Sequence, residues 1–384
     1  MHDITVVREP LFIPQDCDAA DVQLLWHYTT TSYRSFSTSN GGATIIDQTL
    51  KTQVVEQALA SPFLLDCVLG LTAMHLKFLG QDAAAAAAPA VSKLALYRAR
   101  AFEGYRAAVQ RADPRTFPSL VVCSLMICAL SSDMFRGDDA RPLYIVDWIT
   151  VWRGIGLMIN LTTPRALTQS GVGALFLRPP IDLNTSALHV PSNLLFMVSS
   201  LKPADPDYAH AATYYDTLKY LGSLYKELAT TGFGPVLDIR IITFFTFLPF
   251  EFVDLARQRR PRALVIIAHH LVFMRVVRKT WWLAGIPEQE LPAICDQLLP
   301  RHHWDPYLRV PRAAIRIREP TEVARLLINN HEWEPPGADA PPADKEWDPR
   351  DFHLGWVDNS GQMRTLHDDA PGQQPAAAEK GSGV

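Results

Sequence analysis

The chain has 384 residues, of which 48% are hydrophobic and 20% are charged, and its formal net charge is −4. This composition is typical of a globular protein, and it excludes both a disordered chain and a strongly basic nucleic-acid-binding protein. No apolar run reaches the roughly eighteen residues that span a bilayer, and the polar residues 1–3 do not resemble a signal peptide, so we expect an intracellular protein.

The cysteines predict reduced thiols and no zinc site. Their number is odd, their spacing is irregular, and most of them lie within apolar patterns, so they are expected to be buried and unpaired. No C-x2-C pair occurs in the chain, so the sequence predicts neither a zinc finger nor a zinc cluster. The five cysteines are Cys17, Cys67, Cys123, Cys128 and Cys295.

Helical periodicity dominates the first half of the chain. Asp18 and Asp21 precede an apolar stripe with i, i+3, i+4 spacing, which predicts a helix with acids at its positive end. A second helix is expected from Ser61 as N-cap and Pro62 as first residue to a stop at Gly80. Three more helices are predicted over 92–111, 118–133 and 142–159. The second of these three is apolar almost all round, which predicts a central, enclosed helix.

The second half begins with an irregular crossing over 169–191, rich in Gly, Pro and Ser. A long amphipathic helix is then expected from Asp205 through Leu228, followed by two helices over 239–260 hinged at Pro249 and an apolar helix from Pro261. The residues expected to face inward from the long helix are Tyr208, Ala212, Tyr215, Leu218, Leu221 and Tyr225.

The composition changes beyond about Asn330. Residues 331–384 hold eleven Asp or Glu against four Lys or Arg, with many Pro, Gly and Ala, so most of this segment is expected to be disordered. Its alternation of acids with aromatics is typical of activation segments, and an acidic tail partly packed on the domain explains it equally well. The sequence therefore predicts an all-α fold with an N-terminal extension (1–15), one helical domain (16–330) and an acidic tail (331–384).

No motif in the sequence indicates catalysis, a metal or a cofactor. The pairs at 269–270 and 302–303 are adjacent histidines, which on a helix point about 100° apart rather than toward one ion. G-x-S-x-G and glycine-rich phosphate loops are absent, and Gly154 and Gly156 lie inside a helical pattern. Asp133, Asp138 and Asp139 could hold a cation, but their setting is more typical of a helix exit and loop. We expect no metal and no cofactor.

The densest basic group consists of Arg257, Arg259, Arg260 and Arg262. A solvated helix end is the usual explanation for such a group, because cations favour helix C-termini. Contact with nucleic acid has little support, since no groove-reading element accompanies these arginines.

Several apolar helical stripes each carry one polar residue. This pattern suits an apolar cavity that binds a lipid-like or terpenoid ligand, and an ordinary core with satisfied polar groups explains it equally well. The candidate ligand-binding residues are Leu71, His75, Tyr105, Trp148, Trp152, Tyr215, His270 and Phe273.

A series of short motifs resembles the C-terminal regulatory domain of fungal zinc-cluster transcription factors, sterol uptake control type, over roughly 16–320. The motifs occur in the family's order: LLWHYTT at 24–30, SPFL at 61–64, AMHL at 73–76, RRPRAL at 259–264, AHH at 268–270 and WW at 281–282. The resemblance implies an all-helical regulatory domain, often a homodimer, that senses a small molecule. In sterol-responsive members this molecule is a membrane sterol. It also implies a location in the nucleus or cytoplasm.

The chain departs from the family because it carries no C-x2-C-x6-C zinc cluster and no basic linker. A truncated gene model, a regulator that does not itself contact DNA, or a repurposed ligand domain would each explain this. The last alternative is a cofactor-free cyclase or isomerase that holds an apolar substrate near His75 or Asp147. We expect a ligand-sensing transcriptional regulator that does not bind DNA directly through this chain.

Overall fold

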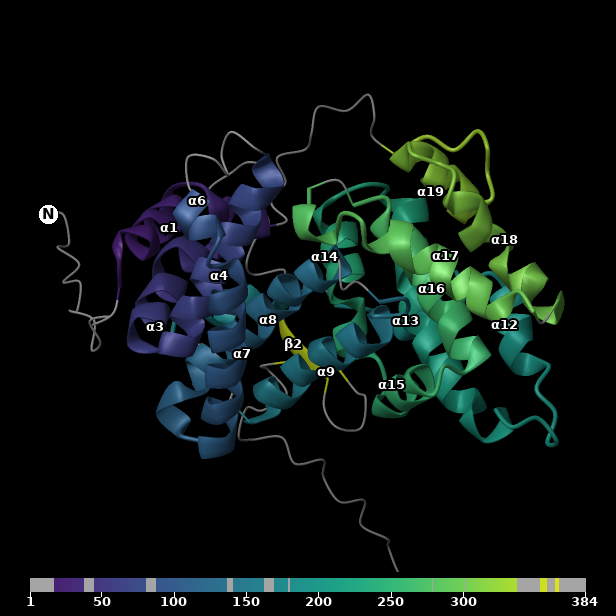
Figure 1. Cartoon of the computed structure of the whole chain (residues 1–384). Helices are drawn as coiled ribbons and strands as arrows, with labels where there is room; N and C mark the ends of the chain where they lie inside the picture. The colour runs from purple at the N-terminus through teal and green to yellow at the C-terminus, as the bar shows by residue number, and fades with distance from the viewer. Residues whose placement is uncertain are drawn as a thin grey trace, which may run out of the picture.

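The computed structural model describes residues 17–37, 45–80, 88–136, 141–161, 169–178, 180–277, 279–300, 302–336, 353–357 and 363–365. Within these ranges the chain is mostly helical, and the prediction of an all-α fold is confirmed (Figure 1). The predicted N-terminal extension and the possible cation-binding role of Asp138 and Asp139 lie outside the described residues.

The N-terminal part packs around α4, whose residues from Phe63 to Leu76 are all buried. The two acids lie at the start of α1 as predicted, and Asp18 also forms a capping box with Asp21. Ser61 precedes α4 as predicted, but its hydroxyl donates to Ser119 Oγ (2.9 Å) instead of capping the helix. The elements are α1 (Ala19–Thr30), η1 (Ser32–Phe36), α2 (Ile45–Gln48), the π-helix η2 (Thr49–Gln53), α3 (Val54–Ala60), α4 (Pro62–Leu79), α6 (Ala88–Val91) and α7 (Leu94–Arg111).

The middle of the chain supplies the central helices. Almost every residue of α8 is buried, as its apolar composition predicts, and α8 packs between α4 and α9. The irregular segment predicted over 169–191 contains only short elements. The elements of this part are η3 (Pro114–Thr116), α8 (Phe117–Ser131), η4 (Ser132–Phe135), α9 (Ile145–Leu161), η5 (Gly173–Phe176), α11 (Leu183–Ala187) and α12 (Ser192–Ser199).

The C-terminal part packs around α13 and α16, and every residue of α16 from Ala263 to Met274 is buried. The predicted hinge at Pro249 is confirmed, with a 3-10 turn before it. The elements are η6 (Tyr208–His210), α13 (Ala211–Thr230), α14 (Pro235–Thr243), η7 (Phe244–Phe247), α15 (Phe250–Arg257), α16 (Pro261–Met274), η8 (Trp281–Leu283), α17 (Ile286–Leu298), η9 (His302–Trp304), α18 (Asp305–Ala314) and α19 (Pro320–Ile328).

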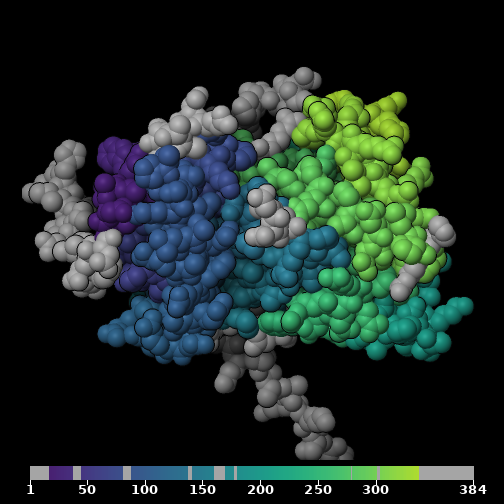
Figure 2. All heavy atoms as spheres, in the orientation of Figure 1, coloured from purple at the N-terminus to yellow at the C-terminus, as the bar shows by residue number. Residues whose placement is uncertain are grey.

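Figures 1 and 2 show α1, α4 and α7 (purple and blue) on one side of the molecule and α16 to α19 (green to yellow-green) on the other. Helices α8 and α9 pack together between them. A small antiparallel sheet lies beside α9, in the order β1 (Leu177–Arg178), β2 (His353–Val357), β3 (Met363–Thr365). Leu177 pairs with Leu354, so part of the predicted tail pairs with the helical domain.

Helix α13 corrects the predicted inward face. The helix begins at Ala211, after the 3-10 turn η6, and Tyr214 rather than Tyr215 is fully buried. Tyr215 is 42% exposed, and Lys219 Nζ lies 5.4 Å from its ring centroid. Because neighbouring helical residues are about 100° apart, burial of Tyr214 turns Tyr215 toward solvent. Ala212 is exposed for the same reason, and Tyr208, which lies in η6 before the helix, is also exposed.

Two segments, Pro62–Leu79 and Pro114–Phe135, are long and apolar enough to cross a membrane, which the inspection of apolar runs did not predict. Their most apolar windows are 78% and 72% buried inside the protein. Burial on all sides by protein is the setting of a core helix, so these segments give no clear membrane span.

Candidate ligand cavity

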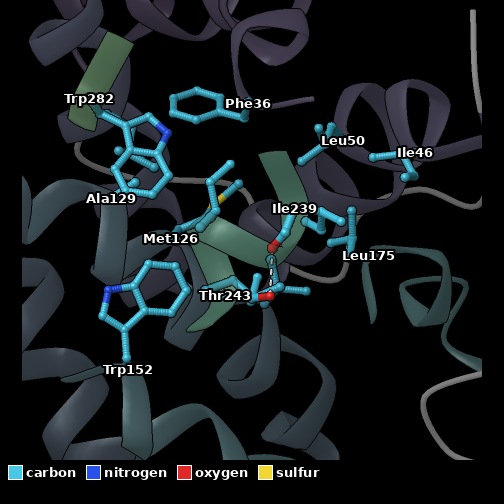
Figure 3. Close-up of a pocket in the computed structure, with 14 residues that line it drawn as sticks. Phe36, Ile46, Leu50, Met126, Ala129, Trp152, Leu175, Ile239, Thr243 and Trp282 are labelled. Atoms are coloured by element: carbon cyan, nitrogen blue, oxygen red, sulfur yellow. Dashed lines mark hydrogen bonds between the residues drawn. The ribbon is translucent and has the colours of Figure 1, made fainter. Parts of the chain in front are cut away.

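An apolar cavity lies where α4, α8, α9 and α14 meet the N-terminal segments and η8 (Figure 3). Its volume is about 130 Å³. Helix α8 contributes four lining residues because its apolar surface extends almost all round. The lining residues are Phe36, Ile46, Leu50, Leu71, Val122, Leu125, Met126, Ala129, Trp152, Leu175, Ile239, Ile242, Thr243 and Trp282.

Two polar groups of the wall are occupied or turned aside. The Thr243 hydroxyl donates to the carbonyl of Ile239 (2.6 Å) within α14, shown as a dashed line in Figure 3. Trp152 Nε1 is buried and has no partner among the described residues, and Figure 3 shows it on the side of the indole away from Thr243. The cavity therefore presents hydrocarbon and aromatic surface, which favours an apolar guest.

Two tryptophans from distant parts of the chain form one wall. The rings of Trp152 and Trp282 are stacked with centroids 6.2 Å apart. Arg136 Nε donates to the carbonyl of Ala284 (2.9 Å), and its Nη2 donates to the carbonyl of Trp282. These bonds fix η8 against η4, so they hold Trp282 in place over the cavity.

The opposite wall includes a π-helical segment. Leu50 lies in η2 and Ile46 in the adjoining α2, and the Tyr28 hydroxyl donates to the carbonyl of Leu50 (3.1 Å). π-Helical turns are rare and are frequently found at functional sites. The backbone beside Leu50 thus combines an uncommon helical form with direct contact to the cavity.

The size of the cavity limits what it holds as it stands. An apolar cavity of about 150 Å³ in another protein accepts benzene, whereas sites for larger ligands measure roughly 300–1,000 Å³. A volume of about 130 Å³ accommodates one ring or a short branched chain. A whole sterol needs outward movement of part of the wall.

Of the predicted ligand-binding residues, Leu71 and Trp152 line the cavity. Trp148 lies directly behind them, with its ring centroid 5.5 Å from that of Trp152 and its Nε1 donating to the carbonyl of Cys128 (2.9 Å). These three residues come together because α4, α8 and α9 pack against one another.

His75 lies one layer away from the cavity. Its Nδ1 is 2.8 Å from Ser32 Oγ, and its ring centroid is 5.0 Å from that of Trp281. Burial, together with the smaller effect of the nearby His27, lowers the pKa of His75 to about 4. The imidazole is therefore neutral near pH 7, and its nearest polar partner is a buried serine.

The remaining predicted residues do not line the cavity, and their binding roles stay predictions. His270 Nε2 bonds the carbonyl of Ile241 (2.9 Å), and its ring stacks on Phe244 at 4.3 Å. Phe273 packs against Tyr225, with centroids 4.8 Å apart. Tyr105 packs against Phe63, and Tyr215 is exposed at the surface of α13.

Most of the lining residues escaped the sequence analysis. The apolar pattern of α8 marked a central helix but could not show which residues face a void. Ile46 and Leu50 belong to a short helix whose π turn interrupts the 3.6-residue period. Trp282 was visible as half of a tryptophan pair, which was the only signal for it.

The enzyme alternative gains no support from this site. The Asp147 side chain is 53% exposed and pairs with Arg141 (2.6 Å), away from the cavity. His75 has no acidic partner among the described residues. Likewise, the part of the chain that the structure describes holds no cluster of three or more His, Cys, Asp or Glu side chains that could bind a metal.

A second, polar cleft of about 310 Å³ lies at the start of α16 and includes Trp304 in its wall. Arg262 pairs there with Asp205 (3.0 Å) and Asp207 (2.9 Å), and Arg260 pairs with Asp207 (3.2 Å). The two arginines of the basic group that enter the cleft are therefore neutralised by carboxylates, which argues against a phosphate-binding role for them.

No family model matches the chain. The chain is similar to a Zn(2)-C6 fungal-type transcription factor of Gibberella zeae, with 21% identity over 311 residues. The chain is distantly related to fungal transcription factors. The matched region covers 76% of this chain and 61% of the relative, so the chain spans about three fifths of the relative that it matches.

Proposed function

We propose that this chain is a regulatory domain of a fungal transcription regulator and that it senses an apolar small molecule, terpenoid or sterol-like, in the cavity beside Trp152 and Trp282. The observation that carries the proposal is an apolar cavity inside an all-helical protein related to fungal transcription factors. A nuclear location and a homodimer belong to the same proposal.

The binding step would start from the present cavity and enlarge it. Ile46 and Leu50 lie on the continuous helix over 45–60, which the π turn η2 interrupts, and Leu175 lies on the short η5, whereas the opposite wall is made by α8 and by η8, which Arg136 holds. The π turn and the short η5 are the irregular parts of the wall, so we expect the wall at η2 and η5 to move outward. A ligand that fits only the enlarged cavity shifts the population toward the enlarged conformation, and this change in conformation is the signal that ligand binding produces.

Binding is tested on the purified full chain with dehydroergosterol and farnesol as probes and tryptophan fluorescence as the readout. We expect both probes to change the fluorescence of the wild type, because two tryptophans line the cavity. Ala129→Leu fills the cavity and should abolish this change. Trp281→Phe, which alters the neighbouring tryptophan outside the lining set, should preserve probe binding. Equal binding by wild type and Ala129→Leu would exclude the cavity as the site.

Regulation is tested separately, by fusing the full chain to a heterologous DNA-binding domain in a yeast reporter strain. We expect reporter output to change with the probe that binds in vitro, and Ala129→Leu to remove the response. A fusion that changes transcription without any response to probes would retain the regulatory role and reject ligand sensing. Imaging of the tagged chain and light scattering of the purified protein test the nuclear location and the homodimer.

A further inference from the structure

Arg153 is a buried cation with no acidic partner in the described part of the chain. Its residue is 6% exposed, and its Nη1 donates to the carbonyl of Thr246 (2.8 Å). By contrast, Arg240, whose side chain is 12% exposed, pairs with Glu227 (2.9 Å). Burial lowers the pKa of Arg153 to about 10. An unpaired charge in the interior is costly, so a native chain that keeps one usually has a use for it.

Three hydrogen-bonding groups around Arg153 have no partner within the described ranges. They are Nε of Arg153 itself, the hydroxyl of Tyr220 on α13 and the hydroxyl of Thr246 on η7. All three atoms are buried. Arg153 binds the backbone of Thr246, and the ring of Tyr220 stacks on Phe247, the next residue (centroids 6.0 Å apart, 15° between planes). Elements α9, α13 and η7 thus bring one guanidinium and two hydroxyls together.

Glycine one turn along α9 makes room for the guanidinium. A Cβ on Gly156 would lie 3.2 Å from Arg153 Nη1, whereas a Cβ on Gly154 would meet nothing within 4 Å. On the other side, the Arg153 guanidinium lies 3.7 Å from the ring centroid of Phe250, which is 40% exposed. The guanidinium is therefore held between a helix surface and an aromatic ring that reaches solvent.

We infer that Arg153, Tyr220 and Thr246 form a binding site for a small oxyanion, a carboxylate or a phosphate. The edge of the guanidinium that carries Nε and Nη2 matches two oxygens of such an anion, and the two hydroxyls donate to the same group. Movement of the Phe250 ring gives access from solvent. None of the three residues lines the apolar cavity, so this inference does not depend on the proposed function.

The test uses the purified full chain and measures calorimetric binding and thermal stability with acetate, phosphate or chloride at equal ionic strength. We expect acetate or phosphate to bind and to raise the Tm above the value in chloride, because a ligand of the native state stabilises it. Preference for acetate identifies a carboxylate site, and preference for phosphate identifies a phosphate site.

The variants Tyr220→Phe and Thr246→Val each remove one hydroxyl and should weaken binding by about tenfold or more, as expected for a hydrogen bond to a charged group. Arg153→Met should abolish binding. Tyr214→Phe removes a hydroxyl from an equally buried tyrosine on the same helix and should leave binding unchanged. The inference fails if neither oxyanion binds more tightly than chloride, or if Tyr220→Phe and Thr246→Val bind as the wild type does.

Discussion

Glu290 is the buried carboxyl with the clearest consequence for stability. It lies on α17, is fully buried, and its Oε2 accepts from the backbone N–H of Ile145 (3.3 Å) at the start of α9. Burial raises its pKa to about 7, against the opposing effect of the backbone donors at Ile145 and Tyr144. The Glu290 carboxyl therefore links α17, which follows Trp282 in the chain, to α9, which carries Trp152.

The pH dependence of this group follows from the direction of its shift. An acid whose pKa is higher in the folded state stabilises the fold at low pH, and this contribution falls as pH rises from about 4.5 to 7. Glu290→Gln should remove the fall, so the variant gains stability relative to wild type by no more than about 3 kcal/mol between pH 5 and pH 8. Urea unfolding at both pH values measures this. An equal difference between the two proteins at both pH values would contradict it.

The two glycines of α9 offer a matched pair. Gly154→Ala should stabilise the protein by about 0.5–1 kcal/mol, because alanine restricts the unfolded chain and meets open space in the fold. Gly156→Ala should gain less, since its Cβ crowds the Arg153 guanidinium. Thermal unfolding of the two variants compares them directly. A larger gain for Gly156→Ala would show that the guanidinium moves aside at no cost.

At the scale of elements, the crossing of α11 and α13 depends on a glycine. A Cβ on Gly222 would lie 2.2 Å from the carbonyl oxygen of Ser186 and 2.8 Å from a methyl group of Val190. A backbone carbonyl in a short helix cannot rotate away as a side chain can. The two helices therefore approach as closely as they do only because residue 222 has no side chain.

Gly222→Ala should accordingly destabilise the protein by about 2–3 kcal/mol, the usual cost of overpacking, despite the better helix propensity of alanine. Denaturant unfolding at pH 7 measures the loss, and Gly154→Ala serves as the control for propensity alone. Wild-type stability in Gly222→Ala would mean that α11 is free to move away from α13.

Elements also show why the site was only partly predictable. Leu71 and Trp152 lie on long, regular helices, and the apolar stripe of each helix identified them. Tyr215 was predicted from the same kind of stripe. On α13, however, the adjacent Tyr214 fits an apolar stripe equally well, so the sequence did not show which of the two tyrosines faces the core. Leu50 lies where the helical period changes, so no pattern with a fixed period could include it.

At the scale of the molecule, the fold class was predictable because helical patterns with caps and prolines recur throughout the chain. The helix starts at Pro62 and Pro261 agree with the sequence to the residue. The position and the full lining of the cavity were not predictable, because a void is a property of how α4, α8, α9 and α14 meet. The pairing of β1 with β2 joins residues that are far apart in sequence, and no local pattern indicates it.

The buried histidines make the whole molecule sensitive to acid. Burial lowers the pKa of His75 and His269 to about 4 and that of His270 to about 3. A histidine with a lowered pKa in the folded state stabilises the fold above pH 6.5, and this contribution is lost as pH falls toward the folded pKa.

We therefore expect stability to fall between pH 6.5 and pH 4.5, with His75, His269 and His270 all contributing. His270→Asn, which can retain the bond to the Ile241 carbonyl, should make this fall shallower even though it lowers stability at pH 7. Unfolding curves at half-unit pH intervals measure the slope. An unchanged slope in His270→Asn would assign the acid sensitivity to other groups.

The π-helical turn η2 has one more consequence. Residues 45–60 run without a break through α2, η2 and α3, so the π turn adds one residue to an otherwise ordinary helix. If the π turn tightened to α geometry, the helix on one side of it would rotate by about 100° relative to the other side. Deletion of the exposed Lys51 would restore a regular α-helical period while the half-buried Ile46 and the buried Val54 keep their present faces. Such a variant would hold this wall of the cavity in a single helical form. It would show whether the π turn is needed for movement of the wall or only for the shape of the cavity.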